Sequence, residues 1–406
     1  MRLPALFEQG TDMIARSEYL ERMRCLRQRV AEAGLEAFLV SSEDSIYYLT
    51  GVSYRPLERP FFILVKPEGK QVLLVPALEQ EHLRAAPNVD EVLHYWDYPA
   101  PVGQGWAERL LELLEGFGQV GVEPSLPQEI ASRLAHLSPR TLPLVEALRV
   151  VKSPAEVEML RDAARYADLA VEKLLATSYY GVSELELFAQ GRAVQLRIMK
   201  ERGYDVLTSS VLVGSWPAPL SAQPHGVPTI ADRLEVGPHI ALGFLRVNGY
   251  AAECERTYFL SPPREVERAA FAVMLEARRR AFALVRPGVD CSEIDAVTKD
   301  FLQKEGHGGH LLHRTGHGFG LGNHEAPWVA EGCTDVLREN MFISIEPGIY
   351  LPGVGGIRHS DTVRVTRDGY ECLTHAPTDL ASLTITASKR LHRVKGALMR
   401  RAAGVK

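Results

Sequence analysis

The first third of the chain alternates between helical and strand-like spacing of its apolar residues. From 17 to 34 they recur every three or four positions between Arg and Glu, which predicts an amphipathic surface helix. Helical spacing returns at 106–114 and 127–137. Between these segments, short apolar runs are typical of strands in one sheet. These runs are 37–41, 46–51, 61–65 and 72–75. The alternation predicts an α/β domain over residues 1–148.

Two predicted helix starts mark the beginning of a second domain. Ser153, Pro154 and Glu156 form a capping box with proline in the first turn, and Ser183 with Glu186 repeats the device. The expected elements after them are strands within 206–259, a helix over 265–285, a helix capped by Ser292 and ended by Gly306, and further strands. We expect this second domain to span residues 149–387 and the whole chain to be α/β (α+β).

Composition and charge narrow the class of protein. The chain has 406 residues, is 46% hydrophobic and 24% charged, and carries a net charge of −5, which is ordinary for a globular protein and favours neither nucleic acid nor membrane as a partner. Its five cysteines are odd in number and contain no CxxC pair, so neither a disulfide framework nor a thiolate zinc site is indicated. No signal peptide or membrane span is recognisable, and we expect a cytoplasmic protein.

The last segment, 388–406, carries seven Lys and Arg residues and no Asp or Glu. Leu391, Val394 and Leu398 could line one face of a short helix. We interpret the segment as a basic, solvated tail in preference to a nucleic-acid-binding element.

Three stretches concentrate residues with catalytic chemistry. The first, 313–327, reads HRTGHGFGLGNHEAP and places His317 and His324 on a glycine-rich backbone that a ligand can approach closely. The second, 343–350, reads ISIEPGIY and delivers Glu346 at the end of an apolar strand. The third, 355–363, reads GGIRHSDTV. Imidazoles and a carboxylate in this grouping indicate an active or metal-binding site.

In this order and spacing, the three stretches resemble the family of prolidase, aminopeptidase P, methionine aminopeptidase and creatinase. The resemblance extends to 150–163, 223–237 and 249–257, and so covers nearly the whole chain. It implies a creatinase/prolidase-like N-terminal domain followed by a pita-bread catalytic domain. It also implies a homodimer in which Arg59, or as the second choice Arg55, in the loop after 46–51, reaches the partner's pocket and binds substrate.

The metal-dependent members bind two divalent ions through five ligands, and this chain matches that set only in part. His317 and Glu346 occupy two of the positions, and Glu253 replaces an Asp at a third. The other two carboxylates are absent: one position falls at or next to Ala241, and Ser360 stands at the other. A dinuclear site is therefore not expected, and no cofactor is favoured. The alternative is one zinc or manganese ion on Glu253, His317 and Glu346.

Creatinase, the branch that works without metal, shares further features with this chain. Glu255 precedes Arg256 as a glutamate does in creatinase, and such a carboxylate can hold a cationic substrate group. His225, in a PHG segment, matches the family's proton-carrying histidine. The resemblance thus implies catalytic and substrate-binding residues. The catalytic set is His225, His317, His324 and Glu346, and the substrate-binding set is Glu253, Glu255, Arg59 and Arg358.

Three functions remain open. The favoured one is hydrolysis of a C–N bond in a small substrate without the dinuclear metal site. The second is an Xaa-Pro dipeptidase or aminopeptidase with a mononuclear site. The third is a catalytically silent pita-bread binding protein. The residues do not separate a guanidino compound, a cyclic amidine and a dipeptide as substrate.

Overall fold

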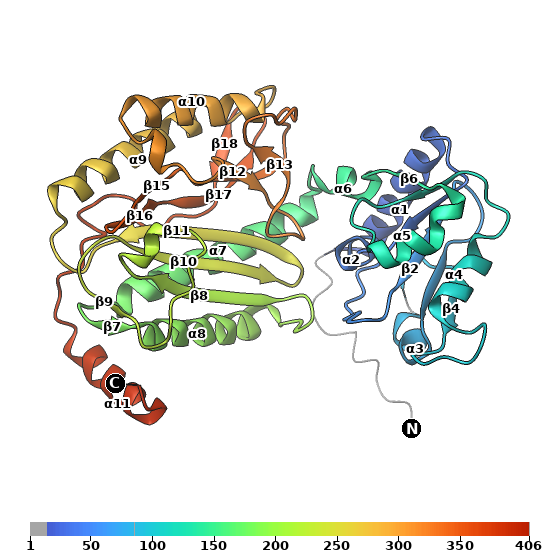
Figure 1. The fold of residues 1–406 in the computed structure, drawn as a ribbon, viewed down its shortest axis with the longest axis horizontal. Coiled ribbons are helices and arrows are strands. Elements are labelled where there is room, and N and C mark those ends of the chain that lie inside the picture. The colour runs from blue at the N-terminus through green and yellow to red at the C-terminus, as the bar shows by residue number, and fades with distance from the viewer. Residues whose placement is uncertain (1–13, 85, 406) are drawn as a thin grey trace. The chain divides into compact units, whose positions relative to one another are not determined.

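A computed structural model describes residues 14–84 and 86–405. The chain divides between Arg149 and Val150 into two compact units, next to the expected boundary. Each unit has its own sheet and its own hydrophobic core. The elements are coloured along the chain in Figure 1.

The N-terminal unit is a six-stranded mixed sheet with helices around it. The strand order is β4-β3-β2-β1-β5-β6, with β1 antiparallel to β2 and parallel to β5. The strands are β1 (Ala37–Val40), β2 (Phe62–Val65), β3 (Val72–Pro76), β4 (Glu91–Tyr95), β5 (Val120–Val122) and β6 (Arg140–Thr141). The helices are α1 (Arg16–Glu32), α2 (Glu43–Thr50), α3 (Gln80–Leu83), α4 (Trp106–Leu114), α5 (Gln128–Leu134) and α6 (Leu144–Arg149). The predicted helices at 17–34, 106–114 and 127–137 are confirmed.

The predicted strand at 46–51 is wrong, because this segment belongs to helix α2. The Ser42 side chain accepts a hydrogen bond from the Ser45 amide, and Gly51 ends the helix with φ of 69°. Ile46, Leu49 and Thr50 are buried, so they face the core at helical spacing. A serine cap and acidic residues in the first turn favour a helix over a strand for this apolar run.

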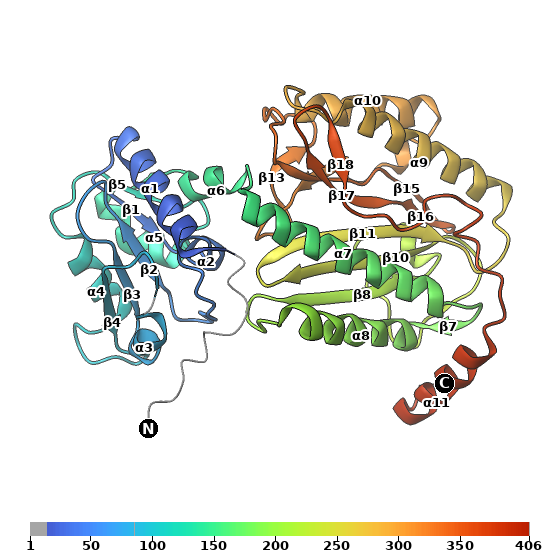
Figure 2. The same ribbon diagram turned by 180° about the vertical axis from the view of Figure 1, so that it is seen from behind.

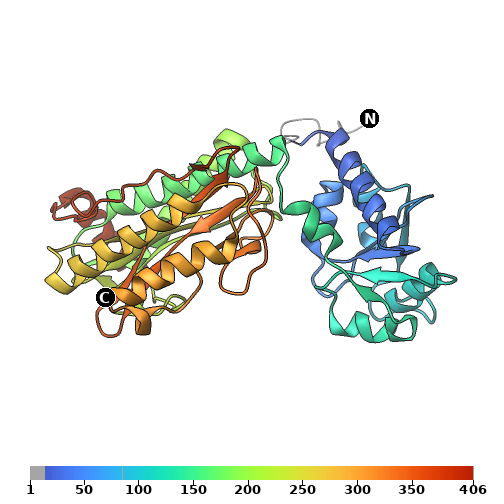
Figure 3. The same cartoon turned by 90° about the horizontal axis from the view of Figure 1, so that it is seen from above.

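The second unit is built on an eight-stranded sheet flanked by two helix pairs. The strand order is β13-β12-β14-β17-β11-β10-β8, and β18 pairs with β17. Helices α7 and α8 contact strands β8, β10 and β11, whereas α9 and α10 contact β13 and β14. Figure 2 shows α7 crossing its half of the sheet, and in Figure 3 α9 and α10 run side by side. Two similar αβ halves are the arrangement of the pita-bread fold, as expected.

The bounds of these elements are as follows. The helices are α7 (Pro154–Thr177), α8 (Glu184–Arg202), α9 (Glu265–Leu284), α10 (Cys291–Lys304) and α11 (Arg390–Ala403). The strands of the large sheet are β8 (Ser210–Trp216), β10 (His239–Val247), β11 (Tyr250–Tyr258), β12 (Gly316–Gly318), β13 (Glu325–Val329), β14 (Phe342–Ile345), β17 (Ser360–Val365) and β18 (Tyr370–Cys372). Two small sheets pair β7 (Val182–Ser183) with β9 (Arg233–Leu234) and β15 (Gly348–Leu351) with β16 (Gly355–Arg358).

The predicted helix starts are confirmed at two of three places. Both capping boxes form, at Ser153 for α7 and at Ser183 for α8. The third expectation is wrong by two residues: α10 begins at Cys291, so Ser292 lies inside its first turn and Asp290 takes the N-cap position. Residues 388–406 contain helix α11, the short helix that the spacing of Leu391, Val394 and Leu398 allowed. No helix in the described part of the chain is long and apolar enough to cross a membrane.

Candidate active site

Hairpin β10–β11 supplies the floor of the pocket in the second unit. Its turn residues Asn248 and Gly249 both have positive φ, as a tight two-residue hairpin requires. The register places Leu242 opposite Glu255 and Phe244 opposite Glu253, and all four side chains line one cavity of about 920 Å³. Side chains alternate between the faces of a strand, so these pocket-facing residues fix which face of β10 points inward.

Ala241 therefore lies on the wrong face to be a ligand position. Its neighbour Gly243, on the same face, approaches helix α7 so closely that a Cβ there would lie 2.6 Å from the carbonyl oxygen of Ala167. Ala241 itself is fully buried and does not line the cavity. The pocket-facing residue beside it is Leu242, and it also lacks a ligand atom. Of the two places that the sequence allowed, at or next to Ala241, the pocket-facing one is Leu242.

His317 is held at the centre of β12 by two glycines. A Cβ at Gly316 would clash with the carbonyl oxygen of Ser344, and one at Gly318 would clash with that of Ala326. The GHG sequence thus lets neighbouring backbone approach both sides of the histidine. The His317 Nδ1–H donates to the Gly318 carbonyl oxygen at 3.2 Å, which directs Nε2 toward the carboxylates of the pocket floor.

Two carboxylates, those of Glu253 and Glu346, lie close to the His317 imidazole. His317 Nε2 lies 3.2 Å from a Glu346 carboxylate oxygen and 3.7 Å from one of Glu253, and the Ser360 hydroxyl donates to Glu253 at 2.5 Å. Burial raises the pKa of Glu253 to about 8, and the nearby Glu346 and Glu255 act in the same direction. Burial also opposes ionisation of Glu346, but the hydrogen bond and charge of His317 outweigh it and lower the pKa of Glu346.

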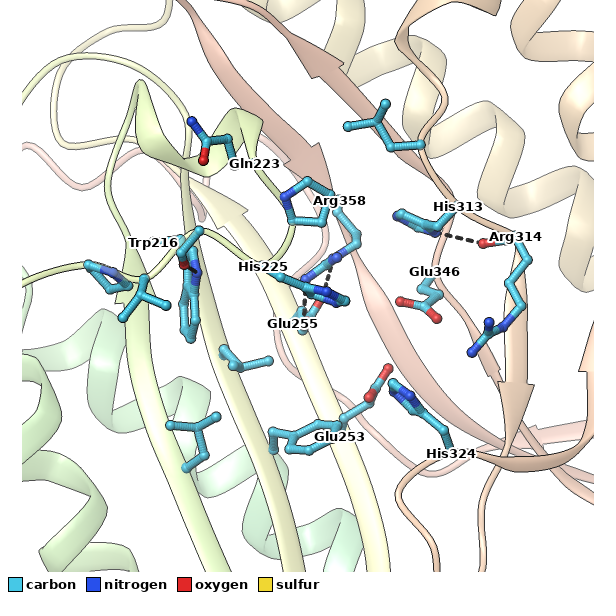
Figure 4. Close-up of a pocket in the computed structure, with 18 of the residues that line it drawn as sticks. Trp216, Gln223, His225, Glu253, Glu255, His313, Arg314, His324, Glu346 and Arg358 are labelled. Carbon is cyan, nitrogen blue, oxygen red and sulfur yellow. Dashed lines mark hydrogen bonds and ion pairs between the residues drawn. The ribbon is translucent and has the colours of Figure 1, made fainter. Parts of the chain in front are cut away.

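A histidine from the neighbouring loop completes this group. The rings of His317 and His324 lie 4.0 Å apart between centroids. One nitrogen from each ring and one oxygen of Glu253 lie within 4.8 Å of one another. Figure 4 shows Glu253, His324 and Glu346 directed toward the same space. Two imidazoles and one carboxylate are a donor set that zinc accepts, with a fourth position open.

Glu255 does not carry a free charge, which changes its expected role. Arg358 forms a buried ion pair with it, and one guanidinium N–H donates to Glu255 at 2.8 Å. Arg358 also donates to the Tyr350 hydroxyl at 3.0 Å, and that hydroxyl lies 2.7 Å from His313 Nε2. Glu255 and Arg358, both expected to bind substrate, are thus paired with each other, and their contact with substrate stays a prediction.

His313, Tyr350 and Arg314 are site residues to which the sequence reasoning gave no role. His313 Nδ1 donates to the Arg314 carbonyl oxygen at 2.7 Å, so the ring is oriented through both nitrogens. The Arg314 guanidinium lies 4.6 Å from the ring centre of Trp328 and lines the pocket. The sequence did point to two of them, because His313 and Arg314 begin the glycine-rich stretch that contains His317.

The two remaining candidates are an exposed loop residue and a residue of the other unit. His225 is exposed and lines the mouth of the cavity, where its ring lies in front of Glu255 and Arg358 in Figure 4. Arg59 lies in the N-terminal unit, where its Nε donates to the Asp97 carboxylate at 2.9 Å. The expectation that Arg59 reaches a partner's pocket stays a prediction.

Comparison with known proteins places the chain in a family. Residues 158–367 match metallopeptidase family M24, and residues 22–161 match the creatinase/prolidase N-terminal domain. An uncharacterized peptidase of Staphylococcus aureus (strain USA300) is 31% identical over 84% of this chain and 95% of its own length.

Solved structures agree with the sequence comparison. The prolidase from Pyrococcus horikoshii OT3 superposes with a TM-score of 0.77 at 27% identity, covering 89% of this chain and 99% of that one. The Xaa-Pro dipeptidase from Bacillus anthracis gives 0.74 at 27% identity, covering 90% and 100%. The chain thus belongs to metallopeptidase family M24, and the protein is a hydrolase of the Xaa-Pro peptidase type.

Proposed function

We propose that the protein hydrolyses a C–N bond in a small, dipeptide-like substrate and that its site holds at most one divalent ion. One observation carries the second part: Leu242 lines the pocket and the Ser360 hydroxyl donates to Glu253, at the two positions where a pair of ions would need carboxylates. The relatives named prolidase and Xaa-Pro dipeptidase support the substrate class.

The pair of metal ions used by related enzymes does not fit the donor set of this pocket. Leu242 has no ligand atom, and Ser360 is a hydroxyl that already donates to Glu253. A neutral hydroxyl is a weak ligand for divalent transition metals at neutral pH. Two dications would therefore lack the bridging carboxylates that offset their mutual repulsion.

A single ion fits better. Glu253, His317 and His324 present their ligand atoms within 4.8 Å of one another, and the Gly318 carbonyl fixes the ring of His317. The expected third ligand, Glu346, is also close enough to His317 to join this set. When bound, one zinc or manganese ion would polarise the scissile carbonyl and lower the pKa of a water molecule.

The walls of the pocket suit a small substrate with one apolar part. Phe188, Leu212, Trp216 and Phe244 line the pocket, and in Figure 4 Arg314 lies across the pocket from Trp216. The guanidinium of Arg358 is already neutralised by Glu255, so Arg314 is the cation we assign to a substrate carboxylate. If the ion uses Glu253, His317 and His324, the carboxylate of Glu346 is left to bind a substrate ammonium group.

We assign proton transfer to His225 at the pocket mouth. In hydrolysis, water adds to the carbonyl carbon, the C–N bond breaks, and the departing nitrogen takes up a proton. His225 would accept the proton from water and return it to that nitrogen. His313, oriented by Tyr350 and the Arg314 carbonyl, would donate or accept a hydrogen bond at the substrate.

Metal analysis and a substrate comparison test this proposal together. Protein purified without chelator is analysed for transition metals and assayed on an Xaa-Pro dipeptide, on the reversed Pro-Xaa dipeptide and on a guanidino acid. We expect no more than one metal equivalent and cleavage of the Xaa-Pro dipeptide. Two equivalents would reject the metal assignment, and cleavage of the guanidino acid alone would reject the substrate class.

A metal-free route like that of creatinase is the second candidate. The Ser360 hydroxyl satisfies Glu253, and Arg358 satisfies Glu255, so two of the three buried carboxylates are stabilised by protein groups. Activity that survives exhaustive chelation, with no metal in the assay, would favour this route over the single ion.

A further inference from the structure

Helix α11 presents an apolar stripe and a basic surface that the hydrolase site does not use. Leu391, Val394 and Leu398 are 64%, 59% and 64% exposed, and they recur at i, i+3 and i+7 on one face. Residues 388–406 carry seven Lys and Arg residues and no acidic residue. Figure 2 shows α11 standing away from the sheet of its unit, beyond β7.

The opposite face of α11 attaches the helix to the second unit. Gly396 is buried, and a Cβ there would lie 2.7 Å from the Tyr179 hydroxyl and would clash with Glu186. Arg400 forms an ion pair with Glu186. At the start of the helix, the Lys389 ammonium donates to carbonyl oxygens at the end of α7, at 2.7 and 2.8 Å. The exposed stripe is thus held outward by the packing of the other face.

Three exposed cations border the stripe. By the 3.6-residue period, Arg390 and Arg401 project on one side of it and Lys395 on the other. A row of apolar side chains between basic ones is typical of a helix that lies in a membrane interface. There the apolar residues enter the acyl boundary and the cations contact anionic headgroups.

We propose that α11 docks the protein onto an anionic lipid surface. Charge complementarity favours an anionic lipid surface as the partner of this helix. The whole chain has a net charge of −5 and residues 388–406 contribute +7, so residues 1–387 carry −12. An anionic surface repels the net charge of residues 1–387 and attracts the basic helix, which orients the protein. Nucleic acid would complement the positive charge of the helix but would leave the apolar stripe uncovered.

Vesicle cosedimentation of the full-length protein tests the proposal. Phosphatidylcholine vesicles are compared with vesicles in which about a third of the lipid is phosphatidylserine. We expect at least tenfold stronger binding to the anionic vesicles, and a steep loss of binding when the ionic strength is raised. Equal binding to both vesicle types, or no binding to either, would overturn the proposal.

Two variants separate the stripe from the charge. Leu391→Ser with Val394→Ser and Leu398→Ser removes the stripe, and Arg390→Gln with Lys395→Gln and Arg401→Gln removes the bordering cations. Each should lower anionic-vesicle binding at least tenfold. A matched control changes two leucines and one valine that are 50 to 57% exposed elsewhere, Leu20, Leu78 and Val266, to Ser and should leave binding unchanged.

Other occupants of the stripe would give different results. If the stripe variant lowers the mass in light scattering while vesicle binding is absent, a second copy covers the stripe and the proposal fails. Binding to a DNA duplex that the stripe variant retains, without binding to vesicles, would likewise reject the lipid surface. Dipeptide hydrolysis in solution should be unchanged in both variants, so this test is independent of the proposed function.

Discussion

At the scale of single residues, the site differs from a two-ion peptidase at two side chains. Leu242 lies opposite Glu255, and Ser360 donates to Glu253, so neither offers a carboxylate to a second ion. What remains is one carboxylate and two imidazoles around a common point. The proton carrier we assign, His225, is exposed and lines the same cavity, near His324.

Restoring both carboxylates should restore the capacity for two ions. The double variant Leu242→Asp with Ser360→Glu places two acids at the pocket floor, and we expect its bound metal to rise toward two equivalents by elemental analysis. The matched control pairs Ala241→Asp with Ser360→Glu. Its aspartate would face helix α7, so we expect no gain in metal and a lower melting temperature. Equal metal uptake by both double variants would contradict the assigned strand face.

Removing the imidazole of His225 should affect turnover and little else. His225→Ala is expected to lower kcat by roughly 10²- to 10⁴-fold on a cleaved dipeptide. Because the side chain is exposed, the melting temperature should stay close to that of the parent. His375→Ala, an exposed histidine of the same unit that does not line the pocket, is the control. An unchanged kcat in the His225 variant removes it from the mechanism.

At the scale of elements, buried charges tie strands and helices of the second unit together. Asp361, on β17, accepts from Arg256 of β11 at 2.7 Å and from Arg278 of α9 at 2.6 Å. Burial opposes its ionisation, but the two guanidinium groups outweigh burial and hold the pKa of Asp361 well below its usual range. This cluster links the two halves of the sheet behind the active site.

Neutralising that carboxylate should destabilise the fold strongly. Asp361→Asn leaves two guanidinium groups facing an amide, and we expect the free energy of unfolding to fall by about 3–5 kcal/mol. Denaturant unfolding monitored by circular dichroism measures the change. The surface pair of Glu276 with Arg279 is the contrast, and Glu276→Gln should cost less than about 1 kcal/mol. A similar small cost for Asp361→Asn would show that the cluster adds little stability.

The buried histidine at the start of β10 should make stability depend on pH. His239 Nδ1 accepts a hydrogen bond from the Ala218 amide at 3.0 Å, and burial lowers the pKa of His239 to about 4 from an ordinary 6.5. Between pH 6.5 and pH 4, His239 is protonated in the unfolded chain but stays neutral in the folded chain. The contribution is therefore complete above pH 6.5 and is lost as the pH falls toward 4.

That loss amounts to about 3 kcal/mol for His239 alone, at 1.36 kcal/mol per pKa unit. Unfolding free energies measured from pH 7 to pH 4 should decline less steeply in His239→Asn, whose amide oxygen can still accept from Ala218. Identical slopes for the parent and the variant would show that another group causes the pH dependence.

At the scale of the whole molecule, two units with separate cores share one chain. The N-terminal core packs β1, β2, β3 and β5 against α4 and α5. The second unit holds every residue of the proposed site except Arg59. The family resemblance assigns Arg59 to a partner's pocket, while within its own unit it is bound to Asp97.

We predict that the protein forms a homodimer and that substrate binding depends on Arg59 of the partner subunit. We expect light scattering to give about twice the chain mass of 45.0 kDa. Arg59→Ala should raise KM for a dipeptide, because a cation that reaches the partner's pocket would bind substrate there. Arg84→Ala, an exposed arginine of the same unit, serves as the control. A monomer, or an Arg59 variant with unchanged kinetics, would end this prediction.

The sequence by itself determined most helix starts and the placing of the chemical groups along the chain. Ser153 and Ser183 predicted the starts of α7 and α8, because a capping box involves only four neighbouring residues. The glycines around His317 and the strand end at Glu346 marked the site for the same local reason. The loss of two carboxylates followed from comparing residue types with the ligand pattern that the family resemblance implies.

Only the tertiary structure decided which side chains meet. The segment 46–51 became a helix because its cap and its buried neighbours outweighed a pattern that suits a strand equally well. Leu242 replaced Ala241 as the pocket residue, since the face of a strand depends on its pairing register and not on its composition. The pairing of Arg358 with Glu255 likewise joins residues that are 103 positions apart, a distance over which local sequence carries no information.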